Sequence, residues 1–414
     1  MQYATLSKSN AIKMIRRNFI KKAGITTASL LLHNSILNAM APGFTAKKVN
    51  IGIIGCGDRG NGLIHVLKEL PEQYQVKAIC DVLDFRLEKA RKIIPSAAFM
   101  KDYHKLLNDK EIDAVIISTP LNMHFPIAKD AIQAGKHIYL EKTMTFNTAQ
   151  ALELVNLVKA KPDLILQVGH QYRYTPLYFK VKDMISKGYL GKVTQIDCRW
   201  DRNGNWRRPV PDPSLERQVN WRMYKEYSGG LPAELLSHQI DFVNWAFETH
   251  VDEVYGTGGI DFYKDGRETY DNVQAVLRYQ KDGMIGNFGA TCANSHDGYL
   301  FKFKGSKGSI SLLVDEGVYY PEKEALKEHR QLVDGVTGAT KITWNKDGGI
   351  PILTEPLKDG SWYSLVEFHK CISTREMPSS NVYTGARTAI TVDMINTSVF
   401  GNSIQQWEPA YDLI

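Results

Sequence analysis

The chain has 414 residues, of which 43% are hydrophobic and 23% charged, so it is long enough for two domains and has the composition of an ordinary globular protein. Its formal net charge of +6 comes from the first 41 residues, which carry six basic side chains and no acidic one, whereas the remainder has 45 of each sign. A neutral body gives no reason to expect nucleic acid or an anionic membrane surface as a partner.

Residues 1–46 are expected to form an export leader. Arg16-Arg17-Asn18-Phe19-Ile20-Lys21 resembles a twin-arginine signal and precedes a moderately apolar stretch, 23–40, which two polar residues interrupt. This stretch is too short and too polar for a permanent membrane span. Ala39-Met40-Ala41 has the form of a cleavage site, although a proline follows it. A twin-arginine signal directs export of folded proteins, so we expect a periplasmic protein. The alternative is that residues 1–46 form an ordinary N-terminal helix.

The cysteines predict neither a zinc site nor thioredoxin-like chemistry, because they are scattered and none forms a C-x-x-C pair. We therefore predict no metal site. Each cysteine is expected to be a small buried apolar residue. The five are Cys56, Cys80, Cys198, Cys292 and Cys371.

A glycine turn after the first strand organises the N-terminal half. Val49 to Ile54 reads as a buried strand, and Gly55, Gly57 and Gly60 follow at G-x-G-x-x-G spacing, ahead of an amphipathic helix. The first glycine permits a tight turn, the second lets backbone approach a pyrophosphate, and the third brings the helix close to the strand. The next strand ends at Asp81, 24 residues after the middle glycine, where a carboxylate can bind the ribose hydroxyls of NAD. A purely structural glycine turn is the alternative.

Strands and helices continue to alternate up to residue 168. We expect strands over 75–80, 97–100, 114–117, 137–140 and 164–168, with helices over 84–94, 103–108, 124–134 and 148–159. Strands this apolar belong to a parallel sheet that is covered on both faces, and ligands of such sheets bind beyond the carboxyl ends of the strands. The residues expected at that edge are Asp81, Ser118, Thr119, Glu141, Lys142, Gly169 and His170.

After residue 170 the pattern changes to a second domain. We expect helices over 177–186, 232–247, 363–373 and 384–399, strands over 193–200, 273–279 and 284–292, a hairpin turn at 305–308, a long loop over 201–230 and an excursion over 320–360. Alternating strands with helices on one face predict an α+β domain with an open, mostly antiparallel sheet. The predicted domains are the leader 1–46, an α/β Rossmann domain over 47–170 with a parallel sheet, and a substrate domain over 171–414, whose last helices can pack back on the Rossmann domain.

Several motifs together resemble the Gfo/Idh/MocA family of oxidoreductases, over roughly residues 48–410. In chain order they are Ile53-Ile54-Gly55-Cys56-Gly57-Asp58-Arg59-Gly60, Ser118-Thr119-Pro120 followed by His124, Gly135-Lys136-His137-Ile138-Tyr139-Leu140-Glu141-Lys142, Gln167-Val168-Gly169-His170-Gln171-Tyr172-Arg173, Asn220-Trp221-Arg222, and Gly229-Gly230 leading to Glu234-Leu235-Leu236-Ser237-His238-Gln239-Ile240-Asp241. Members are NAD(P)-linked enzymes of sugars, polyols and glycosides, and their second domain often serves oligomerisation. The resemblance implies a carbohydrate substrate and a homo-oligomer.

The glycine turn and the sheet edge supply the predicted cofactor site. We expect NAD rather than NADP, because the carboxylate of Asp81 would repel a 2′-phosphate, although Arg86 nearby leaves some room for one. The predicted cofactor-binding residues are Gly55, Cys56, Gly57, Asp58, Arg59, Gly60, Asp81, Arg86, Ser118, Thr119, Pro120, His124, Glu141 and Lys142.

By resemblance, Lys142 is the lysine of the family's Glu-Lys motif, expected between the nicotinamide and the reacting hydroxyl. An ammonium at that edge would stabilise charge that develops on the substrate oxygen as its proton leaves. The alternative is a solvated surface lysine. Thr143 follows where the family often has proline, which leaves the backbone conformation there open.

His238 is the predicted proton acceptor. Glu234, His238, Asp241 and Trp245 fall on one stripe of the expected helix. A histidine with a near-neutral pKa can accept the hydroxyl proton, and Glu234, one turn away, can orient the ring. The family usually has aspartate in place of Glu234. The alternative is the polar face of an amphipathic helix.

The loop over 201–230 is dense in tryptophan, arginine and asparagine and predicts the substrate side. Aromatic faces pack on pyranose rings, and forked donors bind hydroxyls. An oligomer interface and a nucleic-acid contact are the alternatives, and the neutral body weakens the second. The predicted substrate-binding residues are His170, Tyr172, Arg173, Trp206, Arg207, Trp221, Arg222, Tyr224 and Asp241.

These motifs predict an NAD(H)-dependent oxidoreductase that oxidises a ring hydroxyl of a sugar or glycoside. The first alternative is glycoside cleavage with tightly bound, recycled NAD, because oxidising one ring carbon acidifies its neighbour and permits elimination. The second is a sugar-binding protein without activity, which the presence of Lys142 and His238 argues against.

Overall fold

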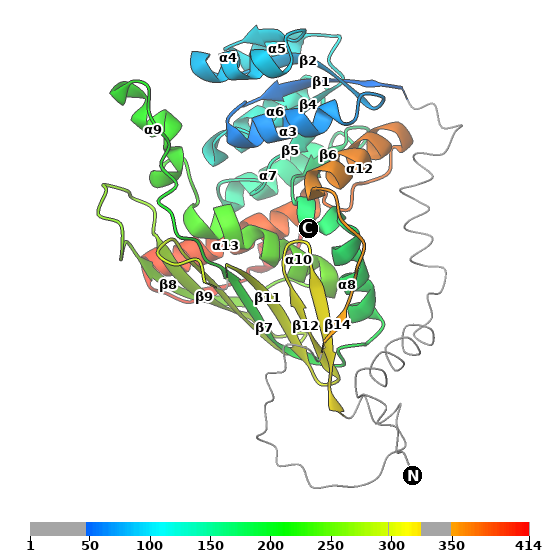
Figure 1. Cartoon of the computed structure of the whole chain (residues 1–414), viewed down its shortest axis with the longest axis vertical. Coiled ribbons are helices and arrows are strands. Elements are labelled where there is room, and N and C mark those ends of the chain that lie inside the picture. The colour runs from blue at the N-terminus through cyan, green and yellow to red at the C-terminus, as the bar shows by residue number, and fades with distance from the viewer. Residues whose placement is uncertain (1–46, 297, 324–348, 414) are drawn as a thin grey trace, which may run out of the picture.

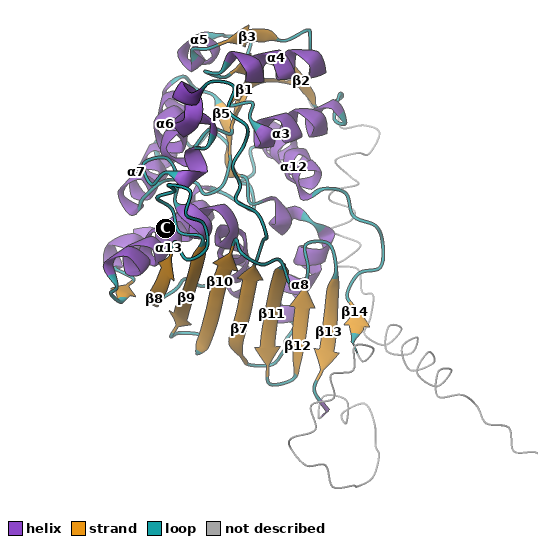
Figure 2. Cartoon of the chain, turned by 60° about the vertical axis from the view of Figure 1, so that its left-hand side comes forward, coloured by secondary structure: helices purple, strands orange, loops and turns teal. Residues whose placement is uncertain are grey.

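The computed structural model describes residues 47–296, 298–323 and 349–413, so the predicted leader and most of the predicted excursion lie outside the described residues. Two sheets are stacked along the long axis of the molecule (Figure 1). The helices that cover the second sheet lie on its side facing the first sheet (Figure 2). Ligand-binding strand ends of the first sheet can therefore meet side chains of the second domain.

The N-terminal domain is a six-stranded parallel sheet in the order β3-β2-β1-β4-β5-β6. Its strands are β1 Val49–Ile54, β2 Tyr74–Cys80, β3 Ala98–Met100, β4 Ala114–Ile117, β5 His137–Leu140 and β6 Leu166–Val168. The helices between them are α3 Asp58–Lys68, α4 Asp84–Ile93, α5 Tyr103–Asn108, α6 His124–Gln133 and α7 Thr148–Lys159, with the short turn η1 Leu121–Met123 before α6. This strand order and the parallel pairing confirm the predicted α/β domain. The short apolar runs form its strands, as expected for a parallel sheet that is covered on both faces.

The second sheet has nine strands in the order β14-β13-β12-β11-β7-β10-β9-β8-β15. All neighbours are antiparallel except β7 and β10. The strands are β7 Val193–Trp200, β8 Glu253–Gly259, β9 Asn272–Tyr279, β10 Met284–Thr291, β11 Tyr299–Gly305, β12 Gly308–Leu312, β13 Gly317–Pro321, β14 Ile350–Pro351 and β15 Gln405–Gln406. The predicted open, mostly antiparallel sheet is confirmed. Sequence reasoning missed β8 because its three glycines have low strand propensity.

Helices cover one face of this sheet. They are α8 Pro176–Ser186, the π-helical turn η5 Pro232–Leu236 with α10 Ser237–Phe247, and α13 Val382–Gly401. The second domain also has short helical segments, namely η2 Gln171–Tyr174, η3 Pro213–Leu215, α9 Glu216–Val219, η4 Trp221–Met223 and η6 Pro409–Leu413. Helix α12, Gly360–Thr374, lies instead beside the first sheet, and its Leu365 and Phe368 share one buried core with Ile51 of β1. The C-terminal segment thus fastens the two domains together.

The five cysteines are buried and free, as predicted. Among the described residues, no helix combines the length and the apolar character that crossing a membrane requires. The described residues also contain no cluster of three or more His, Cys, Asp or Glu side chains suited to a metal ion.

Candidate active site

The glycine turn has the geometry that its spacing predicts. Gly55 has φ +92°, and a Cβ there would lie 2.6 Å from the carbonyl oxygen of Ser118. A Cβ on Gly60 would collide with the carbonyl oxygen of Gly55. Only glycine fits either position, so the turn stays tight and α3 begins close to β1.

The first turn of α3 offers backbone donors to an anion. Gly57 precedes the helix, and no side chain caps its N-terminus. The three heavy atoms nearest to a Cβ on Gly57 belong to the guanidinium of Arg86, at 3.6 to 3.9 Å. Unpaired N–H groups and the helix dipole favour a phosphate at such a place. The turn therefore fits the pyrophosphate of a dinucleotide.

Asp81 follows β2 with its carboxylate held in one orientation. Its Oδ2 accepts a hydrogen bond from the backbone N–H of Cys56 at 2.9 Å, and its Oδ1 accepts one from Leu83 at 3.0 Å. Arg86 Nη1 lies 3.9 Å from Oδ2. Each carboxylate oxygen keeps a second lone pair, so both ribose hydroxyls could donate to this side chain.

Beyond the carboxyl ends of β4 and β5 lies a pocket of about 150 Å³. It opens between the two domains, since its walls come from the Rossmann edge, from η4 and from η5. The lining residues are Arg59, Thr119, Leu121, His124, Glu141, Lys142, Gln171, Trp221, Arg222 and Glu234. Eight of these ten belong to the predicted site, whereas Leu121 and Gln171 were missed. Gln171 was within reach of sequence reasoning, because it stands between His170 and Tyr172 in a quoted motif.

Arg59 and Glu141 form an ion pair along the pocket wall. Arg59 Nε lies 2.8 Å from Glu141 Oε1, and Nη1 donates to Ser361 Oγ of α12 at 2.9 Å. Nη2 is buried and has no hydrogen-bond partner among the described residues. A Cβ on Gly169 would lie 2.8 Å from Glu141 Oε1, so that glycine makes room for the carboxylate.

Lys142 reaches across the domain boundary. Its ammonium donates to the backbone carbonyls of Glu234 at 2.8 Å and Ala233 at 3.3 Å, and no described carboxylate lies within ion-pair distance. Burial lowers the pKa of this ammonium, against the opposing charges of Glu234 and Glu141. The Lys142–Thr143 peptide is cis, and Thr143 Oγ1 donates to the carbonyl of Ala233.

His238 lies next to the same turn, four residues after Glu234. Burial lowers its pKa well below the usual value, and the positive charge of Lys142 acts in the same direction. Its Nδ1 is buried without a hydrogen-bond partner among the described residues. The ring packs against Tyr172, at 4.7 Å between centroids, and against Trp200, at 5.6 Å. The structure thus brings a partly buried ammonium and a neutral imidazole to the same turn.

Glu234 does not orient His238 as predicted. Its Oε2 accepts from Arg222 Nε at 2.7 Å, and no described contact joins its carboxylate to the imidazole. Burial opposes ionisation of Glu234, but Arg222 and Lys142 outweigh it and hold its pKa below the usual range. The reason is local: residues 232–236 form a π-helical turn, which does not keep the i, i+4 alignment that an α-helix would give.

A substrate contact is the wrong role for Arg173 and Asp241. Both are at most 2% exposed, and the guanidinium binds both carboxylate oxygens, at 3.0 and 2.5 Å. His170 is 1% exposed, with its Nδ1 3.2 Å from Asp241 Oδ1. Burial lowers the pKa of His170 to about 4. Because the Arg173 guanidinium and the Asp241 carboxylate are buried and bind each other, neither is available to a sugar hydroxyl.

The other predicted substrate residues separate into two groups. Trp221 and Arg222 line the pocket, and Tyr172 contacts His238. Arg207 instead binds Asp265 at 3.0 Å and Glu216, and Tyr224 donates to Glu216. Trp206 stacks with Arg202, whose guanidinium also lies over Trp200.

Of the remaining cofactor-side residues, Ser118 donates to the carbonyl of Gly55 at 2.7 Å, and Pro120 precedes η1. His124 Nδ1 lies 2.8 Å from the carbonyl of Thr143, and its Nε2 lies 3.1 Å from that of Thr119. Burial lowers the pKa of His124, so a neutral ring donates to one of these carbonyls. Thr119 Oγ1 is buried at the pocket wall and has no hydrogen-bond partner in the described part of the chain.

Two family models match this chain. Residues 49–170 match the model described as "Oxidoreductase family, NAD-binding Rossmann fold", and residues 178–311 match the GFO/IDH/MocA C-terminal domain. The two matches together span more than half of the chain.

Curated relatives match over part of their length. The chain is 27% identical over 202 residues to inositol 2-dehydrogenase/D-chiro-inositol 3-dehydrogenase of Lactiplantibacillus plantarum, covering 48% of this chain and 53% of that protein. It is 30% identical over 235 residues to glycosyl hydrolase family 109 protein 1 of a Shewanella species, covering 50% of each. The chain thus spans about half the length of these relatives.

Among solved structures, levoglucosan dehydrogenase in complex with NADH and levoglucosan superposes with a TM-score of 0.69 at 22% identity, covering 87% of this chain and 99% of that one. The structure of an oxidoreductase from Thermotoga maritima gives a TM-score of 0.70 at 16% identity, covering 89% of this chain and 100% of that one. The structure of an oxidoreductase domain protein from Kribbella flavida gives a TM-score of 0.71 at 18% identity, covering 87% of this chain and 99% of that one. At these identities the likeness shows the fold.

Proposed function

The chain belongs to the Gfo/Idh/MocA family of oxidoreductases, and on that premise we propose that it oxidises a ring hydroxyl of a sugar or glycoside with NAD. The observation that carries the proposal is the meeting of Lys142 and His238 beside a pocket at the carboxyl edge of an NAD-binding Rossmann sheet. One side chain can hold negative charge on an oxygen, and the other can remove its proton.

NAD would be held by three parts of the Rossmann edge. Backbone N–H groups of the Gly57 turn fit the pyrophosphate, and the carboxylate of Asp81 fits the adenine-side ribose. Residues that line the pocket beyond β4 and β5, among them Thr119 and Trp221, would hold the nicotinamide end. When bound there, NAD supplies the acceptor for the hydride.

The side chains of this chain manage the proton and the charge. His238 is neutral at pH 7, because its pKa is lowered well below the usual value, so it can accept the proton of the substrate hydroxyl. Lys142 is oriented by two backbone carbonyls, and no carboxylate of the described residues lies within ion-pair distance of it, so its ammonium can stabilise the developing alkoxide. Tyr172 and Trp200 lie against each other and against His238, and aromatic faces of this kind suit the apolar face of a sugar ring.

The test is to identify the dinucleotide released from the purified full chain by denaturation and to incubate the protein with a panel of sugars and glycosides. We expect NAD to be released, and NADH and a keto-sugar to form with at least one substrate. Absence of any bound or consumed dinucleotide would overturn the proposal.

A second candidate is glycoside cleavage by oxidation, elimination and re-reduction with NAD that stays bound. The likeness to a protein named glycosyl hydrolase family 109 protein 1 favours it. Oxidation of a ring hydroxyl makes the proton on the adjacent carbon acidic, and loss of that proton can expel a β-positioned aglycone, which takes up a proton and leaves as an alcohol. Water then adds to the double bond so formed, and return of the hydride restores the hydroxyl. This reaction releases aglycone without net NADH, which separates it from dehydrogenation in the same panel.

We also propose that the protein is exported through a twin-arginine signal, since Arg16 and Arg17 precede an apolar stretch in an acid-free leader. Cell fractionation tests this, because Arg16→Lys with Arg17→Lys should retain the protein in the cytoplasm. If the double variant is exported like the wild type, the signal assignment fails.

The uncovered face of the second sheet supports a homo-oligomer. Tyr255 of β8 and Val276 of β9 are directly paired and are 44% and 43% exposed, and Ile285 of β10 is 42% exposed. Adjacent apolar side chains on an uncovered sheet face favour association. Light scattering should give a mass above one chain, and Val276→Glu with Ile285→Glu should reduce it.

A further inference from the structure

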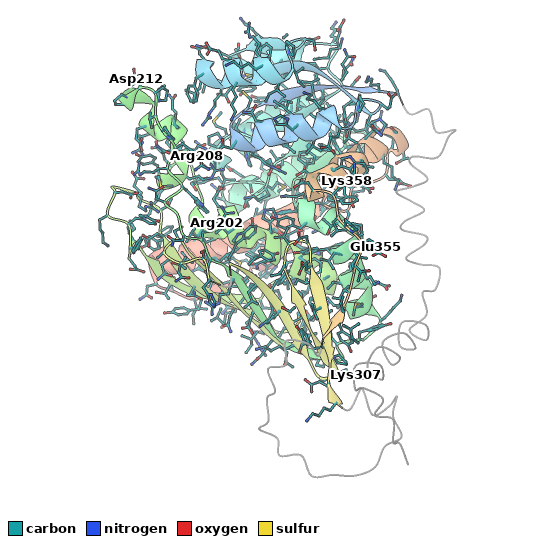
Figure 3. All side chains as sticks on the ribbon, viewed as in Figure 1. Arg202, Arg208, Asp212, Lys307, Glu355 and Lys358 are labelled. Carbon is teal, nitrogen blue, oxygen red and sulfur yellow. The ribbon has the colours of Figure 1, made fainter. Side chains whose placement is uncertain are left out.

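The segment between β7 and η5, residues 201–230, leaves the second domain and returns to it; we call it the arch. Its middle carries η3, α9 and η4, and in the view of Figure 1 α9 lies at the height of the Rossmann helices, away from the second sheet. The arch carries Arg208, which Figure 3 labels. Through this residue the arch reaches the Rossmann domain, because Arg208 Nε lies 2.9 Å from Asp58 Oδ2. Asp58 is the first residue of α3 and follows Gly57 of the phosphate-binding turn.

Arg208 is held in place by a buried side chain. Asn220 is 4% exposed, accepts from the backbone N–H of Arg208 at 2.7 Å and donates to the carbonyl of Arg208 at 3.2 Å. The same amide donates to Glu216 at 2.9 Å, and Glu216 and Asp265 anchor the preceding Arg207. A backbone fixed from both sides positions the Arg208 guanidinium at the turn.

The ion pair with Asp58 does not by itself explain this arrangement. The side chains of Arg208 and Asp58 are 53% and 62% exposed, and pairs this exposed contribute little to stability. Arg208 Nη1 donates to the carbonyl of Trp206 at 3.3 Å, and Nη2 makes no hydrogen bond with any described residue. The guanidinium therefore keeps donors for a further anion beside the turn.

Positive charge from several elements gathers at this turn. The Arg208 hydrogen bond is the largest effect that lowers the pKa of Asp58, with further contributions from Lys89 and Arg222. Arg86 covers Gly57 from α4. A dinucleotide pyrophosphate carries two negative charges, and the first turn of α3 supplies only partial positive charge. A full positive charge here complements the pyrophosphate.

We propose that Arg208 is a cofactor-binding residue supplied by the second domain, whose guanidinium neutralises the pyrophosphate on the first turn of α3 and slows release of the dinucleotide. This inference rests on the proposed use of NAD. It gives the arch a function besides lining the substrate side: it closes over the cofactor from the opposite domain and retains it.

The test measures binding rather than turnover. Full-length wild type, Arg208→Ala and Arg208→Lys are freed of dinucleotide with charcoal and titrated with NAD, ADP-ribose and adenosine by calorimetry. Loss of one charged hydrogen bond to phosphate predicts a roughly tenfold higher Kd of Arg208→Ala for NAD and for ADP-ribose, with no change for adenosine, which has no phosphate. The Lys variant should recover part of the affinity, and raising NaCl should weaken the wild type more than Arg208→Ala.

Arg217→Ala is the matched control, because Arg217 lies in the same arch and pairs with Glu226 and Glu268 instead of Asp58. Its Kd values should equal those of the wild type. If Arg208→Ala binds ADP-ribose within twofold of the wild type, or loses adenosine binding to the same extent, the role of Arg208 is overturned. If the wild type binds neither NAD nor ADP-ribose, the proposed function fails with it.

A double-mutant cycle separates attraction of the phosphates from masking of Asp58. In an Asp58→Asn background, Arg208→Ala should still weaken ADP-ribose binding about tenfold if the guanidinium acts on the pyrophosphate. If Asp58→Asn with Arg208→Ala binds as tightly as Asp58→Asn alone, Arg208 only screens Asp58, which overturns the proposal.

Discussion

Helix α10 and the turn before it carry two buried polar clusters that differ in how their charges are satisfied. In one, Arg173 binds both oxygens of Asp241, and His170 lies 3.2 Å from the same carboxylate. In the other, the described residues give the Lys142 ammonium only backbone carbonyls as partners, and they give Nδ1 of His238 none. The first cluster is fully buried and paired, whereas Lys142 of the second is only partly buried and lines the pocket, which separates a cluster that stabilises the fold from one that can contact a substrate.

The paired cluster should dominate stability. Asp241→Asn keeps the shape but leaves the buried Arg173 guanidinium without a counter-charge, which we expect to cost about 3–5 kcal/mol of unfolding free energy. Urea denaturation measures this. Asp183→Asn is the control, because Asp183 and Lys187 form a surface pair on α8 whose loss should barely move the midpoint. A midpoint for Asp241→Asn equal to that of the control would contradict the assignment.

The unpaired cluster should dominate activity. Lys142→Met removes the ammonium at similar length, and we expect kcat to fall by about 10²–10³ on the best substrate. The melting temperature should stay the same or rise, because the variant no longer buries an unpaired charge. A variant that loses activity only in proportion to lost folded protein would place Lys142 with the structural residues.

Acid should destabilise the paired cluster through His170. Its pKa is about 4 in the folded chain and near 6.5 in the unfolded chain, so between these values the unfolded state binds more protons. Stability is therefore complete above pH 6.5 and falls as the pH drops toward 4, by up to about 3 kcal/mol. His170→Gln should flatten this slope in urea titrations at several pH values. An unchanged slope would show that other groups cause it.

The smallest expected effect concerns the carboxylate beside Lys142. Glu234 is the largest opposing charge that raises the pKa of this ammonium, so Glu234→Gln should lower that pKa further. The alkaline limb of the pH–rate profile should then move to lower pH, with little change of rate on the acidic side of that limb. A pH–rate profile measures this; an equal loss of rate at every pH would instead indicate that the Arg222 pair orients the substrate.

Local patterns in the chain predicted most helices and strands and the Rossmann side of the site. Apolar runs defined most strands within two residues, and the positions just after β2, β4 and β5 marked the ligand edge because parallel strands end on the same side. The alignment of Glu234 with His238 could not be predicted, because a π-helical turn and an ion pair with Arg222 replace the regular spacing.

The sequence by itself determined the Rossmann turn and the two-domain architecture, because glycine spacing and apolar periodicity act over short stretches of chain. Lys142 and His238 were singled out largely through the resemblance to the family, since they stand far apart in the chain. Only the tertiary structure decided which buried charges satisfy one another: that Arg173 binds Asp241, 68 residues away, and that Arg208 reaches Asp58, 150 residues away. The first contact depends on how η2 packs on α10 and the second on how the two domains face each other, and no local pattern of the sequence contains either contact.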